Sequence, residues 1–176
     1  MLLCDGAEVV AEGRPAEPGI EVPEAPAFEL AEAASEAGVA SWAEGHPFPT
    51  CFVCGPERVA GDGLRVFPGA VPGSELFAAT WTPEAGANGV VAPELVWAAL
   101  DCPTSAPVFN PGGRPPIVLA RLSVRLDGAV QPGAPHVLLS WALQRDGRKR
   151  HAAGALLTAA GELRATARAL WIELRG

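Results

Sequence analysis

Apolar and polar residues alternate regularly along the C-terminal third of the chain. Between Val118 and Leu126 every second residue is apolar, so one face of a predicted strand carries Val118, Ala120, Leu122, Val124 and Leu126. Strand-like stretches follow at 136–144, 151–159 and 163–174. Turn sequences at Asp146-Gly147 and Ala160-Gly161 join them as tight hairpins. The pattern predicts four antiparallel strands with short connections.

A helical pattern stands directly before these strands. Residues 93–100 place Leu95, Val96, Ala99 and Leu100 at core spacing, and the segment is followed by Asp101. Pro93 suits the first turn of a helix, where an absent N–H costs nothing. Strands are expected at 64–67 and 75–81, with a turn at 68–73 between them and an Asn88-Gly89 turn before the helix. The order strand, strand, helix and four strands predicts an α+β domain with one buried helix.

The first 45 residues differ from this pattern and are expected to form an acidic extension. Residues 2–11 read as a small hairpin turning at Asp5-Gly6, and prolines make 13–26 an irregular connector. Residues 28–37 predict a short, Ala-rich surface helix ended by Gly38. The chain is therefore divided into an extension, 1–45, and a domain, 46–176.

Charge and composition narrow the classes of function. The net charge is −7, and the first 60 residues are rich in acids with only Arg14 and Arg58 against them. General nucleic-acid binding relies on Lys and Arg and is not expected. The 4 cysteines make no disulfide scaffold, no signal-peptide pattern is present, and no apolar run approaches the ~20 residues that cross a bilayer. These features favour a cytoplasmic protein that contacts no membrane.

Three segments resemble the hotdog-fold thioesterase superfamily, in particular its phenylacetate-pathway (PaaI) type. They are the Cys51–Pro56 loop with Gly63-Leu64 after it, the helix Glu94–Asp101, and the closing-strand runs 121–133 and 161–169. The resemblance implies a hotdog fold, a curved antiparallel sheet wrapped around one central helix. It also implies an acyl-CoA thioesterase that works as a homodimer or a dimer of dimers. Such an enzyme needs no metal or cofactor beyond the coenzyme A part of its substrate.

Asp101 is the first candidate for the chemistry. By resemblance, an acid at this helix position activates water or attacks the thioester, and burial raises a carboxylate's basicity. The other interpretation is an Asp that caps the helix, although a negative charge at a helix C-terminus is disfavoured. Glu94 is either a second acid or a first-turn glutamate favoured by the helix dipole.

The helix start departs from the family pattern. Related enzymes often have His-Gly-Gly where this chain reads Ala92-Pro93-Glu94, and Pro93 has no N–H to offer an oxyanion. The amides of Glu94 and Leu95 remain as donors at the helix N-terminus. The departure favours the alternative function, a non-catalytic hotdog protein that binds an acyl or other apolar ligand.

The remaining candidates concern substrate and metal binding. Trp97, one turn before Asp101, either forms part of the wall of an acyl pocket or only packs on the sheet. Arg148 lies in an Arg/Lys-rich hairpin and either binds the phosphates of coenzyme A or only contacts solvent. Cys51 and Cys54 supply half of a zinc site, which His46 and Cys102 complete only if the fold happens to bring them near. The favoured interpretation is a tight loop with small, half-buried thiols and no metal.

Overall fold

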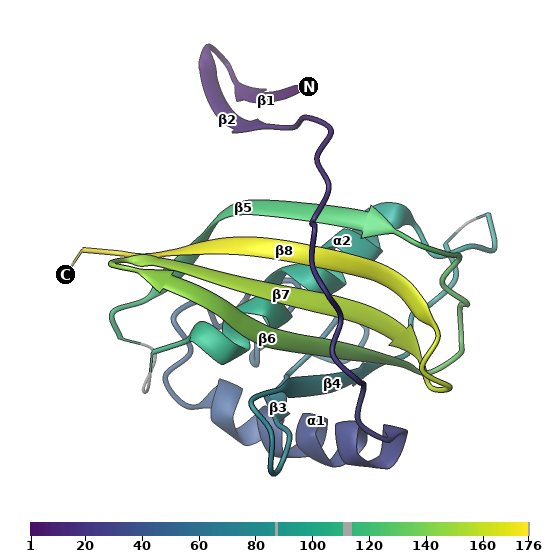
Figure 1. Cartoon of the computed structure of the whole chain (residues 1–176). Coiled ribbons are helices and arrows are strands. Elements are labelled where there is room, and N and C mark those ends of the chain that lie inside the picture. The colour runs from purple at the N-terminus through teal and green to yellow at the C-terminus, as the bar shows by residue number, and fades with distance from the viewer. Residues whose placement is uncertain (87, 111–113, 176) are drawn as a thin grey trace.

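The computed structural model describes residues 1–86, 88–110 and 114–175 (Figure 1). Within these residues the strands are β1 (Leu2–Asp5), β2 (Glu8–Glu12), β3 (Gly69–Ala70), β4 (Phe77–Trp81), β5 (Ile117–Leu126), β6 (His136–Asp146), β7 (Lys149–Thr158) and β8 (Leu163–Glu173). The helices are α1 (Phe28–Ala43), α2 (Pro93–Asp101) and the 3-10 helix η1 (Cys102–Val108). No helix among the described residues is long and apolar enough to span a membrane.

One antiparallel sheet curves around α2. Its strand order is β3-β4-β6-β7-β8-β5, so β5 forms one edge although it precedes β6 in the chain (Figure 1). The predicted α+β hotdog architecture is thereby confirmed. The hairpins β6–β7 and β7–β8 turn at the predicted glycines, Gly147 and Gly161, both at positive φ.

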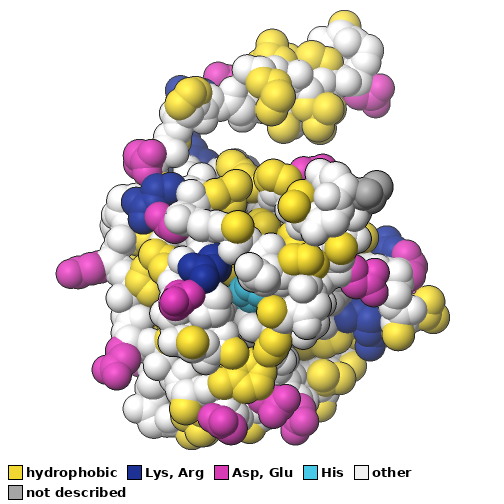
Figure 2. All heavy atoms as spheres, turned by 90° about the vertical axis from the view of Figure 1, so that its right-hand side faces the viewer, with side chains coloured by type: hydrophobic (Ala, Val, Ile, Leu, Met, Phe, Trp, Pro, Cys, Tyr) yellow, Lys and Arg dark blue, Asp and Glu magenta, His cyan; other side chains and the backbone are white. Residues whose placement is uncertain are grey.

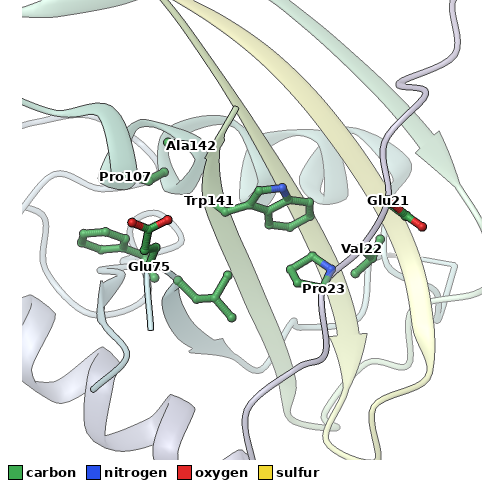
Figure 3. A pocket seen from close by; sticks show the side chains of 9 residues that line it. Glu21, Val22, Pro23, Glu75, Pro107, Trp141 and Ala142 are labelled. Atoms are coloured by element: carbon green, nitrogen blue, oxygen red, sulfur yellow. The ribbon is translucent and has the colours of Figure 1, made fainter. Parts of the chain in front are cut away.

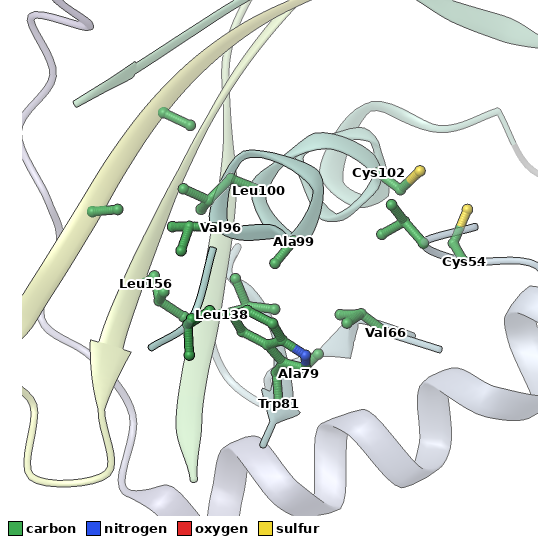
Figure 4. Close-up of a cluster of buried hydrophobic side chains, with 14 residues drawn as sticks. Cys54, Val66, Ala79, Trp81, Val96, Ala99, Leu100, Cys102, Leu138 and Leu156 are labelled. Atoms are coloured by element: carbon green, nitrogen blue, oxygen red, sulfur yellow. The ribbon is translucent and has the colours of Figure 1, made fainter. Parts of the chain in front are cut away.

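Alternation along the central strands builds two apolar layers. Leu138 and Leu156 point toward α2, where they pack with Val96, Ala99 and Leu100 (Figure 4). Their neighbours in sequence, such as Leu139 and Leu157, belong to a second cluster with residues of α1. Because successive strand residues face opposite sides, the sheet has a helix on each face. The cluster on the α2 side is the one that supports Asp101.

Helix α1 continues past its predicted end. Gly38 is buried inside the helix, and a Cβ at this position would lie 2.2 Å from the carbonyl oxygen of Phe67. The prediction that Gly38 ends the helix was therefore wrong. This glycine lets the backbone around Phe67 and Gly69 approach the helix closely rather than ending it.

Gly38→Ala is expected to destabilise the protein by about 1–3 kcal/mol, because the added methyl group forces two backbones apart. Ala is the better helix former, so propensity alone predicts a change of the opposite sign. The free energy of unfolding from urea titration measures the effect. Ala40→Gly, at an exposed position of the same helix, is the matched control and should cost no more than about 1 kcal/mol. A stabilised Gly38→Ala protein would contradict this packing.

The strand predicted at 64–67 was wrong. Arg65 has a φ of 52°, which interrupts an extended backbone, and the first strand of the six-stranded sheet is instead β3. The amides of Leu64 and Val66 donate to the carbonyl oxygens of Phe52 and Val53, at 2.8 and 2.9 Å. This segment therefore ties down the Cys-x-x-Cys loop and does not extend the sheet.

The long strand at 118–126 is confirmed as β5, but its predicted single apolar face was wrong. The register against β8 shifts between Leu119 and Arg121. Leu119 packs beside Trp171, whereas Ala120 is exposed and Leu126 is 45% exposed. The bulge changes which side of the sheet the alternating residues face.

The predicted N-terminal hairpin is confirmed as the separate two-stranded sheet β1–β2. Figure 2 shows it standing away from the body of the molecule with hydrophobic side chains on its surface. Residues of the predicted irregular connector join it to α1, which contacts β3 and β4.

Candidate active site at the end of α2

Asp101 lies in a hollow of about 180 Å³ where the end of α2 meets the Cys-x-x-Cys loop. Apolar side chains make most of the wall, and the lining residues are Trp42, His46, Pro47, Phe48, Cys51, Cys54, Asp101, Cys102, Ser105, Phe109, Ile117, Val118, Leu119 and Trp171. Trp42 stacks on Phe109 with ring centroids 5.9 Å apart. The hollow is therefore a small apolar chamber containing one carboxylate.

The junction of α2 and η1 fixes the position of Asp101. Pro103 cannot continue an α-helix because it lacks an N–H and its ring collides with the preceding turn. The backbone tightens into η1, and the hydroxyl of Thr104 donates to the carbonyl oxygen of Asp101 at 2.7 Å. The indole N–H of Trp171 in turn donates to Thr104 Oγ1 at 3.0 Å. Strand β8 is thus linked to the end of the helix.

Thr104→Val is expected to destabilise the protein by about 1–3 kcal/mol, because it leaves the buried indole N–H of Trp171 without an acceptor. Urea titration measures this loss. The double variant with Trp171→Phe removes the donor as well, so the two costs should be less than additive. Strictly additive costs would contradict the hydrogen bond.

The carboxylate of Asp101 is poorly solvated. Its Oδ1 atom is buried and has no hydrogen-bond partner among the described residues. Burial, followed by the nearby charge of Cys51, raises the pKa of Asp101 to about 6. A carboxyl group with this pKa is a stronger base than an exposed aspartate and is largely ionised at neutral pH.

Three cysteines gather beside Asp101. The sulfur atoms of Cys51, Cys54 and Cys102 all lie within 4.8 Å of one another. Cys51 Sγ is 3.5 Å from Cys102 Sγ, and Cys54 Sγ is 3.4 Å from His46 Nε2. Hydrogen bonds from Cys102 and then Cys54 hold the pKa of the Cys51 thiol far below its ordinary value. The neighbouring thiols and burial instead raise the pKa of Cys54 and of Cys102, so Cys51 is the charged member of this group.

The other predicted site residues lie outside this hollow. Glu94 is exposed and Leu95 half-buried at the start of α2, and Trp97 is 40% exposed on the same helix. Arg148 lies at the tip of the β6–β7 hairpin and donates to the carbonyl oxygen of Glu173 at 2.8 Å. Within one chain the structure therefore brings together Asp101 and the thiols, but not these four residues.

A larger hollow, of about 620 Å³, lies between the N-terminal connector and strands β4 and β6 (Figure 3). Trp141 and Pro23 face it, and its carboxylates, Glu21 and Glu75, are exposed. Water solvates these two acids, whereas Asp101 is held in an apolar wall. The smaller hollow is therefore the one of the two whose carboxylate is buried and poorly solvated.

Sequence reasoning missed several wall residues, namely Trp42, Phe48, Phe109 and Trp171. They come from segments far apart in the chain, and no local pattern distinguishes them from core residues. The position of Cys102 directly after Asp101 was a usable signal, because a residue at the end of the central helix must lie near its acid.

Comparisons with known proteins agree with this architecture. No family model and no curated protein matches the chain. Among solved structures it is similar to a thioesterase superfamily protein, with 23% identity and a TM-score of 0.58 over 71% of this chain and 61% of that one. The PaaI protein of the E. coli phenylacetic acid degradation operon is 8% identical, with a TM-score of 0.52 over 58% of this chain and 75% of that one. A phenylacetic acid degradation-related protein from Ralstonia eutropha is 20% identical, with a TM-score of 0.51 over 60% of this chain and 82% of that one. At these identities the likeness shows the fold: the chain is a hotdog-fold protein of the architecture found in thioesterase-superfamily structures.

Proposed function

We propose that the protein is an acyl-CoA thioesterase in which Asp101 is the general base or the nucleophile. The observation that carries the proposal is the buried carboxylate of Asp101, with one oxygen unpartnered, in the wall of an apolar hollow. Its environment raises the basicity that either role requires. The hotdog fold adds support, because solved thioesterase-superfamily proteins share it.

In the general-base form of the reaction, Asp101 takes a proton from water as the water oxygen bonds to the thioester carbon. The tetrahedral intermediate then expels the coenzyme A thiolate, which receives the proton. In the nucleophilic form, a carboxylate oxygen of Asp101 bonds to the thioester carbon and the coenzyme A thiolate leaves, which gives an anhydride with Asp101. Water then hydrolyses the anhydride, restores the carboxylate and supplies the proton that the thiolate receives. In both forms water is the co-reactant, and Asp101 is regenerated at the end of each turnover.

The hollow of one chain is open to solvent, and its size favours a small acyl group. Its volume of about 180 Å³ is close to that of a cavity of ~150 Å³ that holds benzene. The substrates we propose are therefore short or monocyclic acyl-CoAs. The Arg148 guanidinium keeps donors beyond the one given to Glu173, and these suit the phosphates of coenzyme A.

The oxyanion donors require a second copy of the chain. Glu94 and Asp101 are seven residues apart on one helix, a rise of about 10 Å, so both cannot contact one reacting carbonyl. Within the chain, the Leu95 amide donates to the carbonyl oxygen of Ala92 at 3.0 Å. We propose a homodimer in which the helix start of one copy, with the Glu94 amide, faces Asp101 of the other. Glu94 is placed there as a second acid, and Trp97 as part of the shared acyl wall.

Ligand binding without hydrolysis is the second candidate. It is favoured by the helix start, where Pro93 has no N–H and the Leu95 amide is already bonded to Ala92. A binding protein tolerates the missing oxyanion donors, whereas a thioesterase loses rate.

Both candidate functions require that the hollow binds an acyl-CoA, and a fluorescence titration tests this binding. Trp42 and Trp171 line the hollow, so binding of a ligand there should change the tryptophan emission until the sites are saturated. The ligand is a thioether analogue of a short acyl-CoA (below, an acyl thioether), which cannot be hydrolysed. Ser105→Trp, which fills the hollow, should weaken this binding at least ~10-fold, and Glu36→Gln on the exposed face of α1 should leave it unchanged. Absence of saturable binding by any acyl thioether rejects both functions. Release of free thiol from the true thioester separates the two.

A further inference from the structure

The cysteine cluster beside Asp101 has the composition of a metal site. Cys51 and Cys54 come from one loop and Cys102 from the end of α2, 51 residues further along the chain than Cys51. Figure 4 shows the sulfur atoms of Cys54 and Cys102 next to each other, although their backbones belong to different segments. All four cysteines of the chain are free thiols.

The distances between the sulfur atoms fit tetrahedral coordination. Zinc–sulfur bonds of about 2.3 Å in a tetrahedron place sulfur atoms about 3.8 Å apart. Cys51 and Cys102 are 3.5 Å apart, and all three sulfurs lie within 4.8 Å of one another. A zinc ion at their centre therefore requires shifts of about 1 Å or less.

Backbone hydrogen bonds hold the loop that carries two of the thiols. The Gly55 amide donates to the carbonyl oxygen of Cys51 at 2.9 Å, and a Cβ on Gly55 would lie 2.5 Å from that oxygen. Two further backbone bonds, from Leu64 and Val66, hold Phe52 and Val53. The Cys-x-x-Cys spacing is the usual half of a structural zinc site, and here the fold itself presents a third thiol.

His46 lies beside Cys54, with Nε2 3.4 Å from Cys54 Sγ, and is not one of the three groups whose ligand atoms lie within 4.8 Å of one another. Its Nδ1 accepts the Phe48 amide at 2.9 Å, so in this conformation Nε2 carries the hydrogen and points it at Cys54 Sγ. To bind a metal through Nε2, the ring must move its hydrogen to Nδ1 and release the Phe48 amide. The structure thus provides three thiolate ligands and one neighbouring imidazole.

We propose that Cys51, Cys54 and Cys102 bind a zinc ion, with His46 or a solvent molecule in the fourth position. Thiolates select zinc over magnesium or calcium, which prefer oxygen ligands. The ion joins the Cys-x-x-Cys loop to the end of α2 and so fixes one wall of the hollow. The site goes beyond the proposed hydrolysis and does not depend on it.

The test measures metal in the full-length protein, purified under reducing conditions and supplied with zinc. Mass spectrometry of metals should find a single zinc ion per chain after exhaustive dialysis. Replacement by Co²⁺ should give sulfur-to-cobalt charge-transfer absorption with the intensity of three thiolates. Cys54→Ser should lower the bound zinc at least ~10-fold, whereas Cys4→Ser, in the exposed hairpin, is the matched control and should retain it. Chelation should lower the melting temperature of the wild type, and added zinc should restore it.

Zinc-free wild-type protein after reconstitution, or cobalt spectra without thiolate bands, would overturn the proposal. So would a disulfide between two of the three cysteines, seen as a loss of two hydrogens in the intact mass of unreduced protein. The cobalt spectrum uses the wild type alone, so misfolding of a variant does not affect the conclusion. None of these measurements involves an acyl-CoA, and their failure leaves the proposed hydrolysis to its own tests.

Discussion

Asp101→Asn is expected to lower kcat for thioester hydrolysis by ~100-fold or more, because an amide neither accepts a proton nor attacks a carbonyl. The substitution preserves the size and shape of the side chain. It also removes a buried charge that lacks a hydrogen-bond partner on one oxygen, so the fold should be at least as stable. Binding of an acyl thioether should change by less than ~10-fold, since the hollow keeps its apolar walls. The loss therefore appears in kcat and not in affinity.

The rate of thiol release gives kcat and the fluorescence titration gives the affinity, so both measurements on the same samples separate a loss of kcat from a loss of affinity. Glu36→Gln is the control, because its carboxylate is exposed on α1 away from the hollow. If Asp101→Asn retained full kcat with the dimer intact, Asp101 would have no part in the reaction. A loss of affinity without a loss of kcat would make it a binding residue only.

Leu126→Asp is expected to separate the proposed dimer and abolish hydrolysis. Strand β5 is an edge of the sheet and contacts α2, and apolar side chains are exposed on both elements: Val90 before the helix, Trp97 within it and Leu126 at the strand end. A carboxylate buried in an apolar interface lacks both water and a partner, so association should weaken by ~100-fold or more. Hydrolysis should fall with it, because the helix start and Asp101 of one chain are too far apart to share a carbonyl.

Val39→Asp is the matched control, because Val39 has the same exposed fraction of 45% but lies on α1. Light scattering after size exclusion should find a dimer for the wild type and Val39→Asp, and a monomer for Leu126→Asp. A monomeric wild type that hydrolyses acyl-CoA would contradict the two-copy site. A dimer unaffected by Leu126→Asp would show that the interface does not include the end of β5, which contradicts the proposed arrangement.

Regular alternation made most of the fold predictable. Strands β6, β7 and β8 and the helix ending at Asp101 follow from local periodicity and turn residues, because each element buries a face whose spacing is visible in the sequence. Errors arose where contacts distant in sequence override local preference. Gly38 looks like a helix end but accommodates the backbone near Phe67. The segment with Arg65 looks like a strand but ties down the cysteine loop.

The sequence predicted the acid of the candidate site, Asp101, but not the side chains that surround it. The position of Asp101 at the end of the only strongly core-patterned helix indicated a buried carboxylate. The aromatic walls come from α1, from the loop after α1, from the residue that follows η1 and from β8, and their meeting depends on how the sheet curves. Cys102 joins Cys51 and Cys54 for the same reason: spacing along the chain shows a pair of ligands, and only the tertiary structure adds the third.

Thiol release by the wild-type dimer, on a panel of short, monocyclic and long acyl-CoAs, tests the proposed activity most directly. We expect turnover that is fastest on the short and monocyclic acyl groups, in keeping with a hollow of about 180 Å³, and that Asp101→Asn abolishes. Thiol release no faster than the uncatalysed background on every member of the panel, from protein that binds acyl thioethers, would contradict a thioesterase and leave a binding protein.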